Sequence, residues 1–405
     1  MKDPVVRRLW ALGSISFFSD FIFGATYIFV MQEGGVSAEL IGVYVAGTVV
    51  VSRLVEAPSG AWGDRYGQRG LIVLGLALWG AGLLLFGLTP HRLFYVPALL
   101  LWSSGAALYS GAPISLVVNA LKTSGNADAV PRALRGAQVA RWLASAAGAA
   151  TVALAAVRVP PAHLVLVAGC LLVASAVWVA LTWPRSSSNR QLGVTRNLLE
   201  GTRTMVTGAR LGILWLTALY SAAISVLIMS WQPVVSGFPE FGGSEASALG
   251  LTLLLFSLAA ALGAWLGRRP KALRAEYAVL ASVICLLGLL LLVGGTIPCT
   301  AVGYLGAEVL VGAGGTLLAV HSHSVIPDEL RNTVTSLLST VAGLSMATAD
   351  LIFGYLWAAV GPVRALHHCA WGLLALTVLL TLWTLTQRGR GDGTTASSPL
   401  HQAKA

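Results

Sequence analysis

Charged side chains are scarce in this chain, and six of them fall inside long apolar stretches: Asp20, Arg53, Glu56, Arg141, Glu308 and Asp350. A charge placed in hydrocarbon costs roughly 2.5 to 3.5 kcal/mol on insertion scales, so such groups usually face a cavity or a partner of opposite charge. An apolar environment favours the neutral form of a carboxyl group, whereas a nearby arginine favours the ionised form. These six residues therefore predict proton exchange and ion pairing inside an apolar body.

Three of these charges are expected at similar depth on neighbouring helices. Asp20 lies twelve residues beyond Arg8, about 18 Å along a helix. Arg53 lies eleven residues before Asp64, about 16 Å along the next helix. Glu56 follows Arg53 by three positions on the same helix face, so Arg53 could pair with either carboxylate. Such a switch would couple proton binding to another event, and the alternative is a permanent ion pair that joins the two helices.

The other three charges predict different roles. Arg141 is expected near the cytoplasmic end of its helix, where it could bridge to Glu56 or to the Asp64 segment and support a gate. Glu308 lies near the middle of its stretch, so we expect it in a wet cavity with a substrate or proton role. Asp350 lies nearer the outer side, and a structural or outer-gate role is expected for it.

Aromatic residues are frequent around Asp20 in the first apolar stretch. An aromatic surface beside an acid suits an amphiphilic or cationic organic molecule, through apolar contact and cation–π attraction. The alternative is ordinary packing and lipid contact. The expected cavity residues are Phe17, Asp20, Phe21, Gly24, Tyr27 and Glu308.

Several other chemistries have no sequence pattern to support them. The chain has no phosphate-binding loop of the GxxxxGK type and no nucleophile motif, so we expect neither direct use of ATP nor an enzyme. His321 and His323 lack nearby acidic or thiol ligands, so no metal and no cofactor is expected. Cys299 and Cys369 begin two stretches on the same side and could pair, although free thiols are expected.

Transmembrane helices are the elements that carry these residues. The chain has 405 residues, of which 56% are hydrophobic, and its mean hydropathy is +0.78. A bilayer accepts such a composition, and roughly 20 apolar residues span it as a helix. Twelve runs of this kind are predicted, at about residues 8–31, 38–63, 71–88, 93–121, 133–157, 162–183, 211–235, 246–267, 277–295, 299–320, 332–360 and 363–385.

The basic residues predict the orientation of these spans. If the N-terminus is cytoplasmic, 21 of the 26 lysines and arginines fall on the cytoplasmic side and three, Arg92, Arg158 and Arg364, on the other. Both termini are therefore expected in the cytoplasm. The net charge of +10 is explained by this asymmetry and by contact with the lipid bilayer, so no nucleic-acid partner is expected.

The chain divides into two parts of six spans. A polar stretch at 184–210 predicts a cytoplasmic linker between helix bundles at 1–183 and 211–387, followed by a disordered cytoplasmic tail at 388–405. The pattern Pro-x-x-Leu-Arg begins at Pro131 and recurs 196 residues later at Pro327, each time opening a span. Gly60-Ala61-Trp62 recurs 203 residues later as Gly263-Ala264-Trp265. Two matches at equivalent places predict halves related by duplication.

The segment from Gly60 to Gly70 carries a family resemblance. It resembles the loop motif of the major facilitator superfamily between spans two and three, and the preceding Glu56-Ala57-Pro58-Ser59-Gly60 resembles a variant found in many bacterial members. The matching positions are Gly60, Asp64, Arg65, Gly67 and Arg69. Trp62 and Gln68 depart from the motif, and the second-half copy has Gly267 in place of the aspartate.

The resemblance implies a gate at the cytoplasmic end of span two. Asp64 would brace the start of span eleven, where a helix N-terminus favours a carboxylate and Arg331 is an additional partner. The alternative for Asp64, Arg65 and Arg69 is a solvated loop. The residues expected in this gate are Gly60, Asp64, Arg65, Gly67, Arg69, Arg331 and Arg141.

The resemblance also implies a function, namely that of a secondary transporter resembling bacterial drug or metabolite exporters. Two bundles would rock around a midplane cavity, with protons exchanged at Asp20, Glu56, Arg53 and Glu308. Efflux of a hydrophobic drug or natural product is the first expectation, although the fifth span lacks the Gly-x-x-x-Gly-Pro motif of many drug antiporters. Import of a small metabolite by proton symport is the alternative, and a membrane receptor or lipid-handling protein is a third.

The composition, rich in Arg, Ala and Gly, hints at a GC-rich bacterium. The expected location is therefore the bacterial cytoplasmic membrane. The protein is also expected to be a monomer.

Overall fold

The computed structural model describes residues 4–88, 92–183, 211–267, 275–325 and 331–392. Within these ranges the regular structure is helical, with no strand, which confirms the expected all-α class. Ten helical stretches of the described chain are long and apolar enough to cross a membrane. The helix α7 and the shorter, apolar α12 lie among them, so the described helices accommodate the twelve expected spans.

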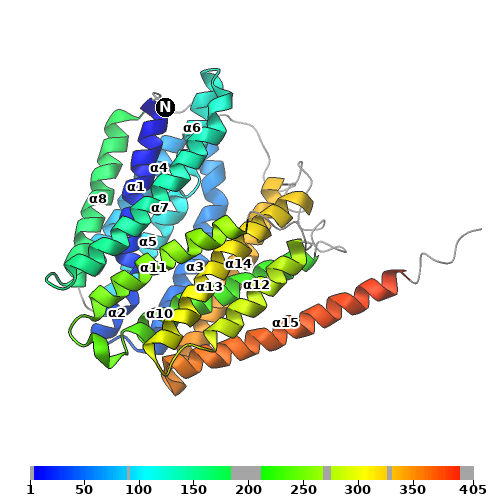
Figure 1. The fold of residues 1–405 in the computed structure, drawn as a ribbon. Coiled ribbons are helices and arrows are strands. Elements are labelled where there is room, and N and C mark those ends of the chain that lie inside the picture. Colours follow the sequence, from blue (N-terminus) through cyan, green and yellow to red (C-terminus); the bar gives the residue numbers. More distant parts are fainter. Residues whose placement is uncertain (1–3, 89–91, 184–210, 268–274, 326–330, 393–405) are drawn as a thin grey trace, which may run out of the picture.

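The helices form two groups, here called the N-terminal half and the C-terminal half (Figure 1). The N-terminal half contains α1 (Pro4–Gly24), α2 (Tyr27–Glu33), α3 (Ala38–Tyr66), α4 (Gln68–Leu88), α5 (Arg92–Tyr109), α6 (Ala112–Thr123), the 3-10 helix η1 (Ala127–Ala129), α7 (Val130–Ala155) and α8 (Pro161–Thr182). The C-terminal half contains α10 (Leu211–Val235), the 3-10 helix η3 (Pro239–Phe241), α11 (Glu245–Leu266), α12 (Ala275–Leu290), α13 (Ile297–Val325), α14 (Arg331–Val360) and α15 (Pro362–Asp392).

Two of the expected spans are interrupted. The first is divided into α1 and α2 after Gly24, where glycine and Thr26 are weak helix formers. The fourth is divided into α5 and α6 at Ser110 and Gly111. Proline lacks the amide hydrogen that an unbroken helix needs but is tolerated in the first turn of a helix, and Pro113 lies in the first turn of α6. The hydrophobic pattern continues through both breaks, so the pattern does not mark them.

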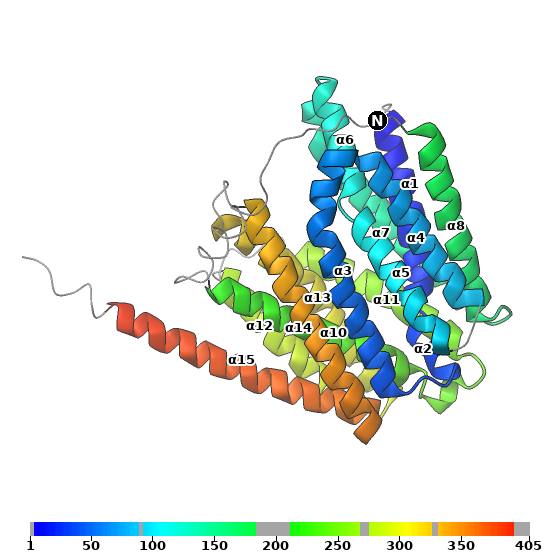
Figure 2. The same cartoon turned by 180° about the vertical axis from the view of Figure 1, so that it is seen from behind.

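Two helix pairs make most of the contact between the two halves. The second span of each half packs against the fifth span of the other, as α3 on α14 and α7 on α11. This reciprocal pairing is the arrangement expected of duplicated halves. The helices of the two halves lie close together at the end of the molecule that carries α2, and they diverge toward the end where α1 begins (Figures 1 and 2).

Glycines allow the closest approach between the halves. A Cβ atom added to Gly42 of α3 would lie 2.8 Å from the Asp350 carbonyl oxygen and 2.9 Å from the Gly354 Cα atom of α14. A Cβ atom added to Gly250 of α11 would lie 2.3 Å from the Ala153 nitrogen of α7. Any larger residue at these glycines would force the backbones of the paired helices apart. The glycines therefore allow the halves to stay in contact at the α2 end.

The predicted linker at 184–210 lies outside the described residues. The predicted tail begins at residue 388, but the backbone of α15 stays helical as far as Asp392. Once a helix has formed, each further residue adds a hydrogen bond at little additional cost, so polar residues continue it beyond the apolar run. The remainder of the tail, at 393–405, lies outside the described residues.

Candidate functional site

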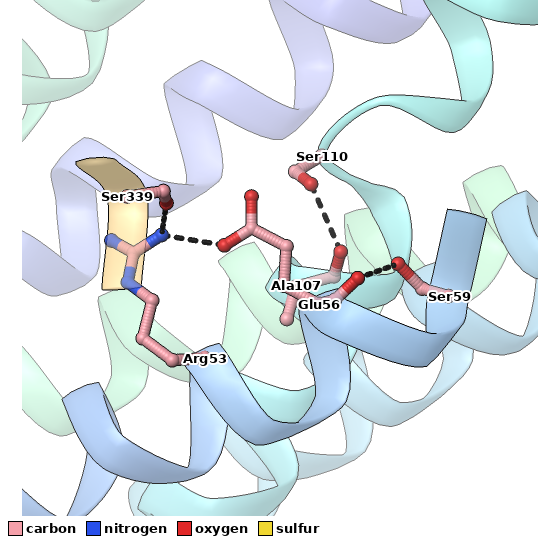
Figure 3. Close-up of polar contacts among 6 residues, drawn as sticks. All are labelled: Arg53, Glu56, Ser59, Ala107, Ser110 and Ser339. Carbon is pink, nitrogen blue, oxygen red and sulfur yellow. Dashed lines mark hydrogen bonds and ion pairs between the residues drawn. The ribbon is translucent and has the colours of Figure 1, made fainter. Parts of the chain in front are cut away.

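Arg53 joins the two halves within the apolar body (Figure 3). One terminal nitrogen of its guanidinium lies 2.5 Å from Glu56 Oε2, and the same nitrogen donates to Ser339 Oγ of α14 at 2.7 Å. The Arg53 side chain also runs past Gly343, where an added Cβ atom would lie 2.6 Å from Arg53 Cγ. The side chains of Arg53 and Glu56 are 30% and 37% exposed, so this pair is reachable by water in spite of its place within a span.

Asp20 has a different partner from the one expected. Its Oδ1 accepts a hydrogen bond from the Trp102 indole nitrogen of α5 at 3.2 Å. Arg53 pairs with Glu56 in this conformation, so the structure shows one of the two pairings proposed for the arginine. A neutral indole donor stabilises the carboxyl group without supplying a counter-charge. Asp20 is therefore held in position while its charge remains open to change.

Tyr27 is buried beside Asp20 in an aromatic cluster. Its ring lies 5.3 Å from that of Phe23 and 6.5 Å from that of Trp102. Its hydroxyl group is in electrostatic range of Asp350 in the C-terminal half and of Asp20 in the N-terminal half. Tyr27 therefore lies near acidic groups of both halves. Part of the predicted aromatic surface is thus packed core, which was the alternative explanation for it.

Arg141 has an environment that the sequence did not predict. Its guanidinium carbon lies 5.1 Å from the centre of the Phe17 ring, and its side chain packs against Gly13 of α1. Its Nε is buried without a hydrogen-bond partner. Arg141 thus joins α7 to α1 by a cation–π contact instead of bridging to Glu56. The position of Arg141 along α7 does not by itself decide which neighbour its side chain contacts. The packing of α1 against α7 decides it.

Phe21 and Gly24, two further expected cavity residues, lie at helix contacts. A Cβ atom added to Gly148 of α7 would lie 3.2 Å from Phe21 Cβ, which places Phe21 against that helix. The carbonyl group of Gly24 accepts a hydrogen bond from Gln232 of α10 at 2.8 Å. Both residues therefore lie where α1 meets other helices.

Glu308 lies on α13 and is partly exposed. Tyr220 of α10 is in electrostatic range of it, and the Tyr220 hydroxyl donates to the Val311 carbonyl one turn further along α13. Among the described side chains Glu308 has neither an ion-pair partner nor a side-chain hydrogen bond. A partly exposed acid without a partner is available for a proton or for a cationic ligand.

Gln232 is a site residue that the sequence reasoning missed. It is fully buried in α10, and its Oε1 accepts hydrogen bonds from the Ile28 and Phe29 amides at 3.1 Å each. Together with the bond to Gly24, the carboxamide occupies the interruption between α1 and α2. The freed backbone groups would otherwise be unpaired in an apolar environment. Gln232 therefore closes the break and joins the two halves.

Ser225 and Trp102 were also missed. Ser225 lies seven residues before Gln232 on α10, and its hydroxyl group contacts Asp350. Polar residues at helical spacing within an apolar stretch are a usable signal for Ser225 and Gln232. Trp102 had no such signal, because its contact with Asp20 depends on how α1 and α5 pack.

The gate residues are described in part. Gly67 separates α3 from α4 with a φ of 90°, a conformation that favours glycine. Arg69 donates to the Ala180 carbonyl of α8, so it acts within the N-terminal half. Gly60, Asp64 and Arg65 lie in the last turns of α3, and Arg331 begins α14. Their side chains, like His323, are outside the described part of the chain.

Within the described ranges the cysteines are free thiols and the possible metal ligands do not cluster. Cys299 is an exposed free thiol and Cys369 is a buried free thiol, so the two are not paired here. The described residues hold no group of three or more histidine, cysteine, aspartate or glutamate side chains that could bind a metal ion.

Comparisons with known proteins identify the family. The sequence matches the model of the Major Facilitator Superfamily over residues 9–350. No curated protein matches the sequence. Among solved structures, the nucleoside transporter NupG superposes with a TM-score of 0.77 at 12% identity, over 94% of this chain and 99% of that chain.

Two further structures show the same fold. A bacterial homologue of the human lysosomal transporter Spinster, solved in an inward-facing and unoccupied conformation, gives a TM-score of 0.69 at 14% identity over 94% of this chain and 96% of its own. The human organic anion transporter MFSD10 gives 0.63 at 15% identity over 94% of this chain and 100% of its own. These matches show the shared fold. The family model covers most of the sequence and the fold agrees with it, so the chain belongs to the Major Facilitator Superfamily.

Proposed function

We propose that this protein is a proton-coupled secondary transporter that exports a hydrophobic or amphiphilic compound by alternating access. The observation that carries the proposal is the position of Arg53, which donates to Glu56 in its own half and to Ser339 in the other. A movement that separates α3 from α14 must break the second contact. The arginine is then free to change its carboxylate partner, and the change alters which acid holds a proton.

Three acidic positions support coupling to protons. Asp20 is held by a neutral indole, Glu56 pairs with Arg53, and Glu308 has no charged partner among the described side chains. Moving one charge through the membrane potential supplies about 2.3 kcal/mol per 100 mV. That energy is sufficient to bias the equilibrium between a form open on one side of the membrane and a form open on the other.

The direction and substrate class are proposed from the side chains near Asp20 and from Glu308. Aromatic side chains near Asp20 and the scarcity of charge favour an amphiphilic, cationic compound. Proton-coupled import of a small metabolite is the second candidate, and the partly exposed Glu308 favours it as a site for a polar substrate. In either case we propose a monomer in the bacterial cytoplasmic membrane, built from the bundles at 1–183 and 211–387 with a cytoplasmic linker between them.

The test is transport in a host that lacks its major export pumps. Cells that express the chain are loaded with a panel of lipophilic cations and antibiotics, and accumulation is measured with and without a protonophore. We expect lower accumulation of at least one compound, restored by the protonophore. Asp20→Asn should abolish this effect at unchanged protein level. Export is contradicted if no compound in the panel shows energy-dependent loss, and protonophore-sensitive uptake would support the importer.

A further inference from the structure

Asp350 of α14 is a buried acid that the proposed function does not use. The residue is 1% exposed, and its Oδ2 has no hydrogen-bond partner. In the described part of the chain the ion pair found is that of Arg53 with Glu56, so Asp350 has no counter-charge there. An isolated carboxylate is so unfavourable in an apolar environment that such a group takes up a proton instead.

The hydrogen bonds around Asp350 agree with a bound proton. The Ser225 hydroxyl oxygen lies 2.5 Å from Asp350 Oδ1 and 3.3 Å from the Met346 carbonyl oxygen. A serine hydroxyl has one hydrogen, and a carbonyl oxygen can only accept. If Asp350 is ionised, Ser225 donates its hydrogen to Oδ1, and Oδ2 remains a buried charged oxygen without a partner. If Asp350 is neutral, it can donate through Oδ1 to Ser225 while Ser225 donates to Met346, and the Oδ2 left without a partner carries no charge.

Few titratable groups face Asp350 from the elements around it. Tyr27 of α2 is in electrostatic range of Asp350, and the same hydroxyl is in range of Asp20. Ser225 is the contact from α10 and Gly42 the contact from α3. The two histidines of α15 are engaged with backbone carbonyl groups elsewhere, namely His367 with Val293 and His368 with Arg364.

Asp350 also lies at the contact between the halves. The added-Cβ distance of 2.8 Å from Gly42 to the Asp350 carbonyl oxygen shows that α3 covers this turn of α14. Because α3 and α14 belong to different halves, a rocking movement that opens the α2 end would uncover Asp350. Burial in one state and exposure in the other make proton affinity depend on conformation, and by linkage the proton then biases the conformation.

We propose that a proton bound at Asp350 stabilises the form in which the halves are closed over it, and that loss of this proton favours separation of α3 and α14. With Ser225 and Tyr27 it forms a second proton site, in the C-terminal half. This inference rests on the proposed proton-coupled transport and adds the group that links protonation to closure of the α2 end.

Infrared spectroscopy of the full-length protein in lipid nanodiscs tests the proposal. A protonated carboxylic acid has a carbonyl stretching band distinct from that of a carboxylate. We expect this band in the difference spectrum between wild type and Asp350→Asn, and its loss as the pH rises. In a background without the four native cysteines, spin labels at the α2-side ends of α3 and α14 should move apart over the same pH range. Asp20→Asn, as the matched control, should keep the Asp350 band.

The outcomes are separable. If the difference spectrum lacks the band, or if the band stays constant while the labels separate, the proposal is wrong. If Asp350→Asn does not fold, Asp350→Glu takes its place and should fold. In that variant the carbonyl band should remain but shift in frequency. A band at an unchanged frequency contradicts the proposal. Failure of the proposed function is detected independently, as absence of protonophore-sensitive transport by the wild type.

Discussion

Arg53 contacts both halves through a single nitrogen atom, and for this reason we propose that closure and charge depend on it together. Its pairing with Glu56 was predictable, because residues three positions apart share a helix face. Its contact with Ser339 was not, because the two residues are 286 positions apart and meet only through tertiary packing. In the same way the sequence predicted that Asp20 needs a partner, and the packing of α5 supplies Trp102.

A double-mutant cycle separates a structural ion pair from a switching one. For Arg53→Met and Glu56→Gln we expect a coupling free energy of unfolding of only about 0.5 to 1 kcal/mol, because the pair is partly exposed. Each single variant should nevertheless abolish proton-driven transport. The measurements are denaturant unfolding in detergent and flux in proteoliposomes.

The control for this cycle is Ser59→Ala, which removes a hydrogen bond of 2.8 Å to the Glu56 carbonyl but no contact between the halves. Ser59→Ala should transport normally. If the Arg53 and Glu56 variants lose flux only in proportion to the folded protein lost, the pair is structural and the switching role is wrong.

At the scale of helices, the sequence predicted the apolar spans well and their interruptions poorly. The expected span at 211–235 has the same bounds as α10. The breaks after Gly24 and at Ser110 were missed because each is too short to change the hydrophobic pattern, and because Gln232, from the other half, stabilises the first of them. Local sequence cannot specify a partner that lies about two hundred positions away.

Closure of the α2 end depends on glycine at the crossing of α3 and α14. In Gly42→Ala the new methyl group would meet backbone atoms within 3 Å, and backbone cannot move aside as a side chain can. Overpacking of this kind costs about 1 to 3 kcal/mol. The closed form should therefore lose roughly 5- to 150-fold in population relative to the form open at this end. Distances between spin labels at the ends of α3 and α14 measure this shift.

The same helix offers a matched control. Gly47 has nothing within 4 Å of an added Cβ atom, so Gly47→Ala should leave the label distances unchanged. Equal shifts in the two variants would mean that altered helix propensity, and not the contact with α14, is responsible.

At the scale of the whole molecule, composition and charge predicted the class, and the repeats predicted two related halves. The reciprocal pairing of spans is a finding of the structure. The conformation could not be predicted, because one sequence supports every state of the transport cycle. In the described state the halves are joined at the α2 end by Gln232 and by the glycine contacts, and they diverge toward the other end. If the predicted orientation is correct, this state is open to the cytoplasm.

Cysteine labelling in intact cells tests the orientation. In a background without the native cysteines, Ser244→Cys lies in the exposed segment before α11 and should react with a membrane-impermeant maleimide from outside. Ser124→Cys lies in the exposed segment after α6, on the opposite side, and should react only after the cells are permeabilised. The reverse pattern would place the N-terminus outside and contradict the orientation derived from the basic residues.

The carboxamide of Gln232 binds main-chain atoms of α1 and α2, so this contact does not depend on the side chains of those helices. Ile28 and Phe29 contribute only their amide groups to it, so any residue except proline at these positions can make the same two bonds. The contact thus constrains one side chain on α10 and no side-chain identity on α2. The identity of Ile28 is limited by its burial in the core and not by this contact, whereas Phe29 can change while the join between the halves is preserved. An alignment of sequences would therefore give no sign that these two amide groups take part in the join.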